Sequence, residues 1–265
     1  MTQFFLPALF ACSALLLGSC GVLAPHEEDV YPTTIEKLTP AEQNARQEAF
    51  VALNDGEVCT PIGVFGFTDW DLGLCVDQPD RRPTELGSGE ALSYARTFLV
   101  RNERFTGVSD PSELVVKRTP GGRVIKFENQ RYQGLEVEYT QILFDPNWRD
   151  SQGRSVAVGG NWYPEIYIPD REAISPEEAQ QRLIGTELDY GWGALVLTVS
   201  AASFPEHARV DKLILPVSFE DRIELRVAWK VEVYPNAPDR GPDFSVYVDT
   251  MTGEQLQVDQ LIIIL

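Results

Sequence analysis

Two stretches near the C-terminal end of the chain decide the fold: RIELRVAWKVEV at residues 222–233 and FSVYVD at residues 244–249. We predict that each forms a β-strand and that Thr252-Gly253 supplies the turn into a last strand at 254–261. Adjacent strands joined by short turns are typical of an antiparallel sheet. Two further strands are expected upstream, at 194–200 and 210–217.

A helix is expected immediately before these strands. Ser175-Pro176-Glu177-Glu178 combines an N-cap serine, a proline at the first helical position and a glutamate at the third. This is the capping pattern of a helix start, and the helix is expected to run to about residue 184. We therefore expect residues 169–265 to form one module, in which a helix packs on an antiparallel sheet.

The preceding part of the chain repeats this order of elements. Apolar residues recur at helical spacing between positions 89 and 104 and predict an amphipathic helix; they are Ala91, Tyr94, Ala95, Phe98 and Leu99. Strands separated by short turns or loops follow, at 114–118, 123–132, 135–144 and 155–162. The sequence thus predicts an α+β fold with two tandem modules, the first covering residues 89–168.

Residues 20–88 are expected to hold a tether, a helix and a loop. The stretch from 21 to about 40 is polar, acidic and interrupted by three prolines, which is typical of a tether. Thr39-Pro40-Ala41-Glu42 has the same capping pattern as the later helix, so we expect a helix from here to about residue 53.

Composition excludes two classes of protein. A chain of 265 residues with 43% hydrophobic and 10% aromatic residues can form a sizeable core, so wholesale disorder is excluded. Forty acidic residues against 22 basic ones give a net charge of −18, and a chain of that charge repels nucleic acid. We expect no nucleic-acid partner.

The N-terminus predicts export and lipid attachment. Residues 4–17 form an apolar run that is too short to span a membrane and is typical of a signal peptide, here residues 1–19. Leu17-Gly18-Ser19-Cys20 resembles a bacterial lipobox, which implies cleavage before Cys20 and acyl chains on its thiol. We expect a lipid-anchored protein of the bacterial cell envelope, on the periplasmic side of the outer membrane if the host has two membranes. The alternative is an ordinary secretory signal in which Cys20 is incidental.

The remaining cysteines predict a disulfide. Cys12 would leave with the signal peptide and Cys20 would carry lipid, so Cys59 and Cys75 remain as a pair in an oxidising compartment. A bond between them would close a loop of roughly fifteen residues and stabilise the fold by about 3 kcal/mol. A metal site is the rival interpretation, although neither cysteine has a second one at short spacing.

Three landmarks in the sequence form a recognisable combination. The first is the expected hairpin KFENQRYQGLEV at 126–137, and the second is the helix start at 175. The third is AWKVEV at 228–233 with FSVYVDTMTGE at 244–254. Together they resemble the pro-region of thermolysin-like metalloproteases, in which a fungalysin/thermolysin propeptide module precedes a PepSY-like module. The positions that carry the match are Phe127, Gln130, Tyr132, Gly134, Trp229, Asp249 and Gly253.

The resemblance covers roughly residues 89–260 and implies a fold of the cystatin-like or PepSY-like kind in each module. It also implies a function, because the family's pro-region inhibits its own catalytic domain and assists its folding. From the residues themselves we expect the landmarks to have structural roles: Gly134 permits a tight turn and Gly253 suits a positive φ.

No catalytic chemistry is expected. The chain has no His-Glu-x-x-His zinc motif, and its histidines are His26 and His207. A phosphate-binding glycine loop and a Gly-x-Ser-x-Gly elbow are also missing from the sequence. The acidic pairs Asp69/Asp71 and Glu177/Glu178 could bind calcium or serve acid/base catalysis, but the disulfide loop and the first turn of a helix explain them as well. We expect no enzyme activity, cofactor or metal.

An aromatic group and the apolar C-terminal residues could each have either a structural role or a role in binding. An aromatic group consisting of Trp162, Tyr163, Tyr167, Tyr190 and Trp192 could form a binding surface or core packing. The apolar residues 261–265 could end a buried strand or dock into a partner.

Two functions of different classes follow. The first is a lipid-anchored envelope protein whose propeptide-like modules bind a peptidase in trans, as an inhibitor or as a folding helper. The alternative is a structural or scaffolding lipoprotein that binds cell-wall or assembly components.

Overall fold

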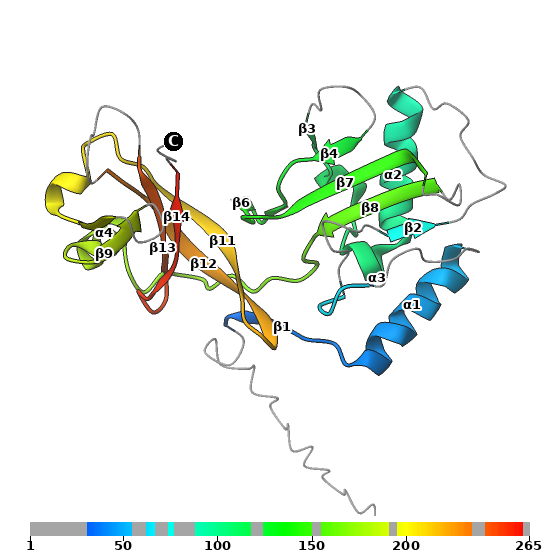
Figure 1. Cartoon of the computed structure of the whole chain (residues 1–265), viewed down its shortest axis with the longest axis horizontal. Helices are drawn as coiled ribbons and strands as arrows, with labels where there is room; N and C mark the ends of the chain where they lie inside the picture. The colour runs from blue at the N-terminus through cyan, green and yellow to red at the C-terminus, as the bar shows by residue number, and fades with distance from the viewer. Residues whose placement is uncertain are drawn as a thin grey trace, which may run out of the picture.

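The structure, a computed structural model, describes residues 31–54, 62–66, 74–76, 88–117, 124–149, 155–190, 195–234 and 242–261. These residues form an α+β fold with two five-stranded sheets and two two-stranded ones, and every named pair of strands is antiparallel. Figure 1 shows the two larger sheets side by side, the first with α2 and α3 beside it and the second with α4. The predicted fold class is confirmed.

The first sheet has the strand order β2-β8-β7-β4-β3. Its strands are β2 (Leu74–Val76), β3 (Val116–Lys117), β4 (Ile125–Phe127), β7 (Gln141–Arg149) and β8 (Ser155–Asn161). The helices with it are α1 (Pro40–Asn54), α2 (Ser88–Arg101) and the short α3 (Glu103–Thr106), followed by a 3-10 turn at Pro111–Glu113. We refer to this sheet and its helices as the first module.

Aromatic side chains form the centre of the first core. Phe50 of α1 packs edge-on against Phe105, with ring centroids 4.9 Å apart, and against Phe98 of α2. Phe98 in turn contacts Phe144 of β7, at 5.6 Å between centroids. Ala95 and Leu99 lie fully buried on the same face of α2, as the apolar spacing predicts.

The second sheet has β12 at its centre, and we refer to it with α4 as the second module. One side of β12 (Arg222–Val233) pairs with β11 (Val210–Ser218) along nearly its whole length. The other side pairs with β13 (Phe244–Asp249) over one part and with β1 (Thr33–Glu36) over the rest. The edge strand β14 (Gln255–Gln260) pairs with β13. The remaining elements here are α4 (Pro176–Leu183), the hairpin β9 (Glu187–Tyr190) and β10 (Leu195–Thr198), and a 3-10 turn at Ala201–Ser203.

Helix α4 begins where its capping pattern predicts. The Ser175 hydroxyl accepts a hydrogen bond from the Glu178 backbone N–H at 3.1 Å, and the Glu178 carboxylate accepts one from the Ser175 N–H at 2.7 Å. Ala179 and Leu183 then pack against the valines of β12 and β13 in one buried cluster.

The prediction of a tether up to about residue 40 is wrong from Thr33 onward. Residues Thr33–Glu36 form β1 and pair with β12, and α1 follows after a three-residue link. The N-terminal arm therefore starts in the second sheet and ends in the core of the first module, as Figure 1 shows. The sequence prediction failed because β1 is only four residues long and its partner strand lies far along the chain.

Two predicted strands are interrupted. The expected strand at 123–132 is split into β4 and β5 (Arg131–Tyr132), and that at 135–144 into β6 (Leu135–Glu136) and β7. At the first break the Gln130 backbone N–H donates to the Thr140 hydroxyl at 2.8 Å and not to a neighbouring strand. The buried Gln130 side chain bonds to the Tyr163 backbone. Conversely, β7 continues to Arg149, five residues beyond the end of the strand expected at 135–144.

Several predictions lie outside the described residues. They concern the signal peptide, the lipidation site Cys20, the disulfide partner Cys59, the acidic pair at 69 and 71, Trp192, and the tail from 262 onward. Cys75 is described only as part of β2, where it pairs with Ala157. Among the described helices, none combines the length and the apolar character that a membrane crossing requires.

Candidate interaction site at the joint between the modules

Residues 137–140, which link β6 to β7, reach from the first module onto the second sheet. Val137 is fully buried and forms a parallel bridge with Ile214 of β11, and the Glu138 N–H donates to the Ile214 carbonyl at 2.9 Å. Tyr139 has a left-handed backbone with φ 58°. That conformation is uncommon for a residue with a side chain, so the contacts around Tyr139 must hold it in place.

The register of the second sheet determines which side chains meet this segment. Lys230, Tyr247 and Gln257 are direct neighbours on β12, β13 and β14, so they lie on one face of the sheet. The neighbouring positions Val231 and Val246 lie on the opposite face, where α4 covers them. The Glu138 and Tyr139 side chains therefore reach the face that α4 leaves uncovered. Val137 packs on the opposite face with Ile214 and Val227.

Six polar side chains converge at this place, and we refer to them as the joint cluster: Glu138, Tyr139, Lys230, Tyr247, Gln257 and Asp259. The Lys230 ammonium lies 2.8 Å from the Glu138 carboxylate. The Tyr247 hydroxyl lies 3.0 Å from Asp259 Oδ2 and 3.3 Å from Glu138 Oε1.

Tyr139 completes the joint cluster from the first module. Its hydroxyl donates to the Asp259 carboxylate and lies 3.2 Å from the Tyr247 hydroxyl. The Gln257 amide donates to the Tyr139 hydroxyl at 2.8 Å and to Asp259 Oδ1 at 2.9 Å. Tyr247 is fully buried, whereas Tyr139 is 42% exposed, so the joint cluster runs from the sheet surface out to solvent.

The electrostatics of the joint cluster favour protonated tyrosines and leave a net negative charge. Burial raises the pKa of the Tyr247 hydroxyl above its usual range, and its hydrogen bond to Tyr139 and the Glu138 charge raise it further. Burial and the hydrogen bond to Asp259 likewise raise the pKa of Tyr139. With both hydroxyls neutral, two carboxylates face one ammonium.

A second polar network fixes the N-terminal arm. The Tyr31 hydroxyl donates to Asp249 Oδ2 at 3.1 Å and accepts from the Val227 N–H at 3.1 Å, at the place along β12 where β1 ends and β13 begins. Arg226 bridges the Asp249 and Glu224 carboxylates at 2.9 and 2.6 Å. Burial and the Asp249 charge raise the pKa of Tyr31.

This network holds its charges in their ionised forms. Burial alone would raise the pKa of Glu224, but hydrogen bonds from Arg222 and Arg226 lower it overall. Every charge in the network therefore has a partner, which is the pattern of a structural element and not of a reactive group.

The landmark residues occupy framework positions. Phe127 is buried in the first core, and Tyr132 packs against the buried cluster that contains Val137 and Ile214. Trp229 donates to the Ile174 carbonyl at 3.1 Å. Asp249 Oδ1 accepts from the Met251 and Thr252 N–H groups and closes the β13–β14 turn, in which Gly253 has φ 72°. Gly134 also has a positive φ, of 86°, in the β5–β6 turn.

The aromatic group proposed as a possible surface is partly core. Trp162 and Tyr163 are almost fully buried, and burial raises the pKa of Tyr163 to about 12. His207 lies in a loop, with its ring 5.2 Å from that of Tyr234. Glu177 and Glu178 lie in the first turn of α4. In the described part of the chain, no three histidine, cysteine or acidic side chains are grouped so as to hold a metal ion.

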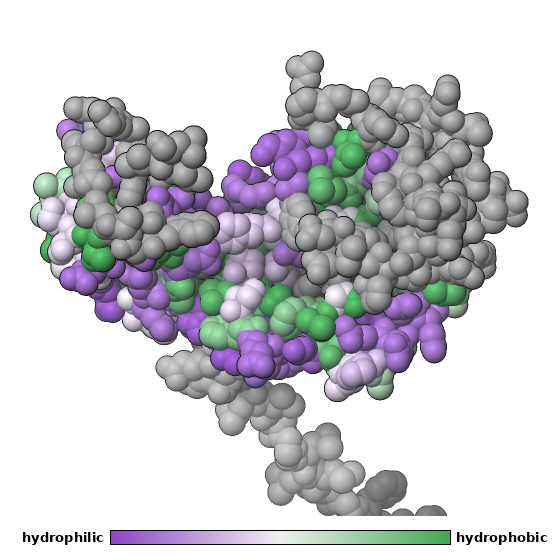
Figure 2. Space-filling view, in the orientation of Figure 1, coloured by the Kyte–Doolittle hydropathy of each residue, from purple (hydrophilic) through white to green (hydrophobic). Residues whose placement is uncertain are grey.

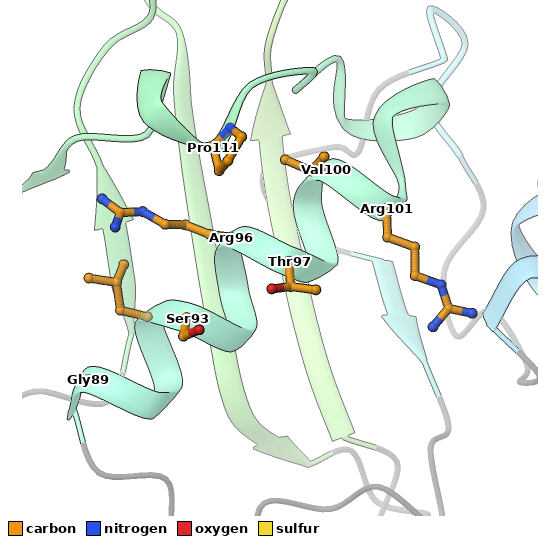
Figure 3. Close-up of a pocket in the computed structure, with 8 residues that line it drawn as sticks. Gly89, Ser93, Arg96, Thr97, Val100, Arg101 and Pro111 are labelled. Atoms are coloured by element: carbon orange, nitrogen blue, oxygen red, sulfur yellow. The ribbon is translucent and has the colours of Figure 1, made fainter.

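A hollow of about 570 Å³ lies along the outer side of α2, between that helix and Pro111. Figure 3 shows that Arg96 and Arg101 point to opposite ends of it, so the two guanidinium groups do not converge on one ligand. Arg96 donates to the Leu114 carbonyl and Arg101 to the Leu53 carbonyl. These contacts anchor neighbouring segments to α2.

The joint cluster is therefore the candidate site. Figure 2 shows hydrophilic side chains on the surface around β6, between the two modules. None of the six residues was singled out in the sequence as a site residue. The sequence pattern that bears on this site is the alternation of Gln257 and Asp259 with apolar residues in the last strand, which places both side chains on one face of the sheet.

Comparison with known proteins leaves the family open. No family model matches the chain, and no curated protein matches it. Among solved structures, the chain is similar to the Bacillus megaterium YpeB C-terminal domain, with 10% identity and a TM-score of 0.31 over 86% of this chain and 99% of that one. The function has to be inferred from the residues themselves.

Proposed function

We propose that this chain is a lipid-anchored protein of the bacterial cell envelope that binds a peptidase in trans through its two propeptide-like modules, and inhibits it or assists its folding. The chain resembles the pro-region of thermolysin-like metalloproteases at landmark positions. In the fold these positions hold other segments in place. The Gln130 side chain bonds to the Tyr163 backbone, Trp229 donates to the Ile174 carbonyl, and Asp249 closes the β13–β14 turn. This placement is the observation that carries the proposal.

The chemistry of the described residues supports binding over catalysis. The ionic network around Arg226 is largely buried, and Arg226 pairs with both Glu224 and Asp249. The joint cluster is linked internally by hydrogen bonds and one ion pair, and it opens to solvent at Tyr139. A fixed polar surface of this kind suits recognition of another protein.

Affinity capture tests the proposal. The full mature chain would be immobilised and incubated with envelope extract, and the retained proteins identified by mass spectrometry. We expect recovery of a peptidase whose activity, or whose refolding yield, changes when the purified chain is added. Repeated recovery of cell-wall or assembly components, with no peptidase and no effect on peptidase activity, would favour the scaffolding alternative.

The anchoring part of the proposal has a separate test. Replacement of Cys20 by serine should move the protein from the membrane fraction to the soluble fraction, because two or more acyl chains are lost with the thiol. Cys12→Ser is the matched control and should leave membrane association unchanged. If both variants fractionate like the wild type, Cys20 carries no lipid.

The disulfide remains part of the proposal. Cys59→Ser and Cys75→Ser should each lower the free energy of unfolding by about 3 kcal/mol, and the double variant by no more than one single variant. Thiol labelling of the unfolded wild type should detect neither cysteine. Labelling of both without reductant would show that the bond does not form.

A further inference from the structure

In the described part of the chain, no strand pairs with the outer side of β14. Among the described residues β14 pairs with β13 alone, and it is the last strand of its sheet. The Leu261 N–H donates to the carbonyl of Asp243, which lies directly opposite it, next to the start of β13. Since hydrogen-bonded pairs alternate along an antiparallel ladder, the next hydrogen-bonded pair is Asp259 with Ser245. Val258 lies on a non-hydrogen-bonded pair with Val246, which directs its backbone N–H and carbonyl away from β13 and toward that outer side.

This edge has only part of the usual protection against pairing. Natural edge strands are protected by charged side chains, especially lysine, by proline, by bulges or by short length, and β14 has one charged residue, Asp259. The strand Gln255–Gln260 contains no lysine and no proline, and its one irregularity lies near its start, opposite Tyr247 and Val248. The part from Gln257 to Gln260 therefore continues in regular register.

A negative charge lies beside the edge. Within the described part of the chain, Asp259 forms no ion pair, and its hydrogen-bond donors are the neutral groups of Tyr139, Tyr247 and Gln257. Lys230 instead pairs with Glu138. The Tyr139 ring, 42% exposed, lies next to this carboxylate. A carboxylate beside an exposed aromatic ring suits an arginine or lysine side chain, which can pair with the one and stack on the other.

We propose that β14 is a docking edge for an extended segment of the partner peptidase that adds to the sheet as a strand and presents arginine or lysine beside Asp259. This inference rests on the proposed function and names the chemistry of the segment that is bound. Main-chain hydrogen bonds to β14 provide the affinity, and the basic side chain provides the specificity.

Charge argues against a second copy of the chain as the occupant. Pairing of β14 with β14 brings two chains of net charge −18 together and places their Asp259 carboxylates near one another. A basic segment has the complementary charge.

Synthetic peptides test the edge directly. The first probe is a nine-residue peptide of alternating threonine and arginine, and the second has each threonine replaced by proline, which keeps the charge but prevents strand pairing. Binding to the full mature chain is measured by fluorescence anisotropy, and protection of the Val258 amide by hydrogen exchange. We expect the first peptide to bind and protect that amide, and the second to do neither.

Variants of the chain separate edge pairing from general attraction. Val258→Pro removes the outward N–H and should weaken binding of the first peptide about tenfold, whereas Val258→Ala, which loses similar packing but keeps the N–H, should not. Asp259→Asn should weaken it about fivefold. The exposed Glu220→Gln removes the same charge at the far end of β12 and should have little effect.

Two results would overturn the inference: equal binding by Val258→Pro and Val258→Ala, or an equal loss with Glu220→Gln and Asp259→Asn. Concentration-dependent dimerisation that Val258→Pro abolishes would also overturn it, because the edge would then hold a second copy. Capture of the peptidase separates this inference from the proposed function. If the wild type and Val258→Pro bind the peptidase equally, the edge inference fails and the proposed function stands; if neither binds any peptidase, the proposed function fails.

Discussion

The Glu138 carboxylate lies 2.8 Å from the Lys230 ammonium, an ion pair between side chains 92 positions apart that belong to different modules. Glu138 is held at this place by its own backbone N–H, which bonds to Ile214 of β11. Together with the arm that runs from β1 to α1, this pair fixes the first module against the second sheet.

The pair should contribute measurably to stability. A double-mutant cycle with Glu138→Gln and Lys230→Gln is expected to give a coupling energy of about 1 kcal/mol, because both side chains are largely shielded from water. The exposed pair Arg209–Asp211 in the second module is the control and should give less than about 0.5 kcal/mol. Urea unfolding of the variants measures both; equal couplings would show that the joint pair contributes no more than a surface pair.

Loss of the Tyr31 hydroxyl should loosen the arm. Tyr31→Phe leaves the Val227 N–H without its partner and removes one donor from the Asp249 carboxylate, so the free energy of unfolding should fall by about 1–3 kcal/mol. Hydrogen exchange should be faster at Thr33 to Glu36 than in the wild type. Unchanged exchange in β1 would show that the arm is held by other contacts.

Two glycines with similar backbone angles should respond differently to alanine. Gly107 has φ 73°, and an added Cβ would lie 2.0 Å from the Trp162 carbonyl oxygen, so Gly107→Ala should be strongly destabilising. Gly134 has φ 86° with no heavy atom within 4 Å of an added Cβ, so Gly134→Ala should cost only about 1–2 kcal/mol for the left-handed backbone. Thermal unfolding compares them, and equal losses would contradict the close approach at Gly107.

Stability should fall at alkaline pH. The pKa of Tyr247 is raised in the folded state, so its contribution is fully present below about pH 10, where tyrosine ionises in the unfolded chain, and is lost as the pH rises further. The slope from this fully buried side chain approaches about 1.4 kcal/mol per pH unit. Unfolding by urea between pH 8 and pH 11 measures it. Tyr247→Phe should flatten the decline, and an identical pH profile for the variant would contradict this assignment.

Local patterns in the sequence predicted the elements whose causes are local. The capping residues Ser175 and Glu178 place the start of α4, and the apolar spacing that includes Ala95 and Leu99 predicts the buried face of α2. The turn at Gly253 was predictable because few residues tolerate a positive φ.

The sequence did not predict the features that depend on contacts between distant residues. The strand β1 is short and polar, and only its pairing with β12 makes it a strand. The joint cluster forms because Tyr139 meets Asp259, 120 positions away. No local sequence pattern in either segment predicts this contact, so the candidate site could be identified only from the fold.

The most direct test of the account is a titration of the purified envelope peptidase with the purified mature chain, with binding and peptidase activity followed together. The account predicts saturable binding at one chain per peptidase, together with a change in activity or refolding that follows the same curve. No saturable binding by any peptidase from the same envelope, at concentrations where the wild-type chain is folded, would contradict it.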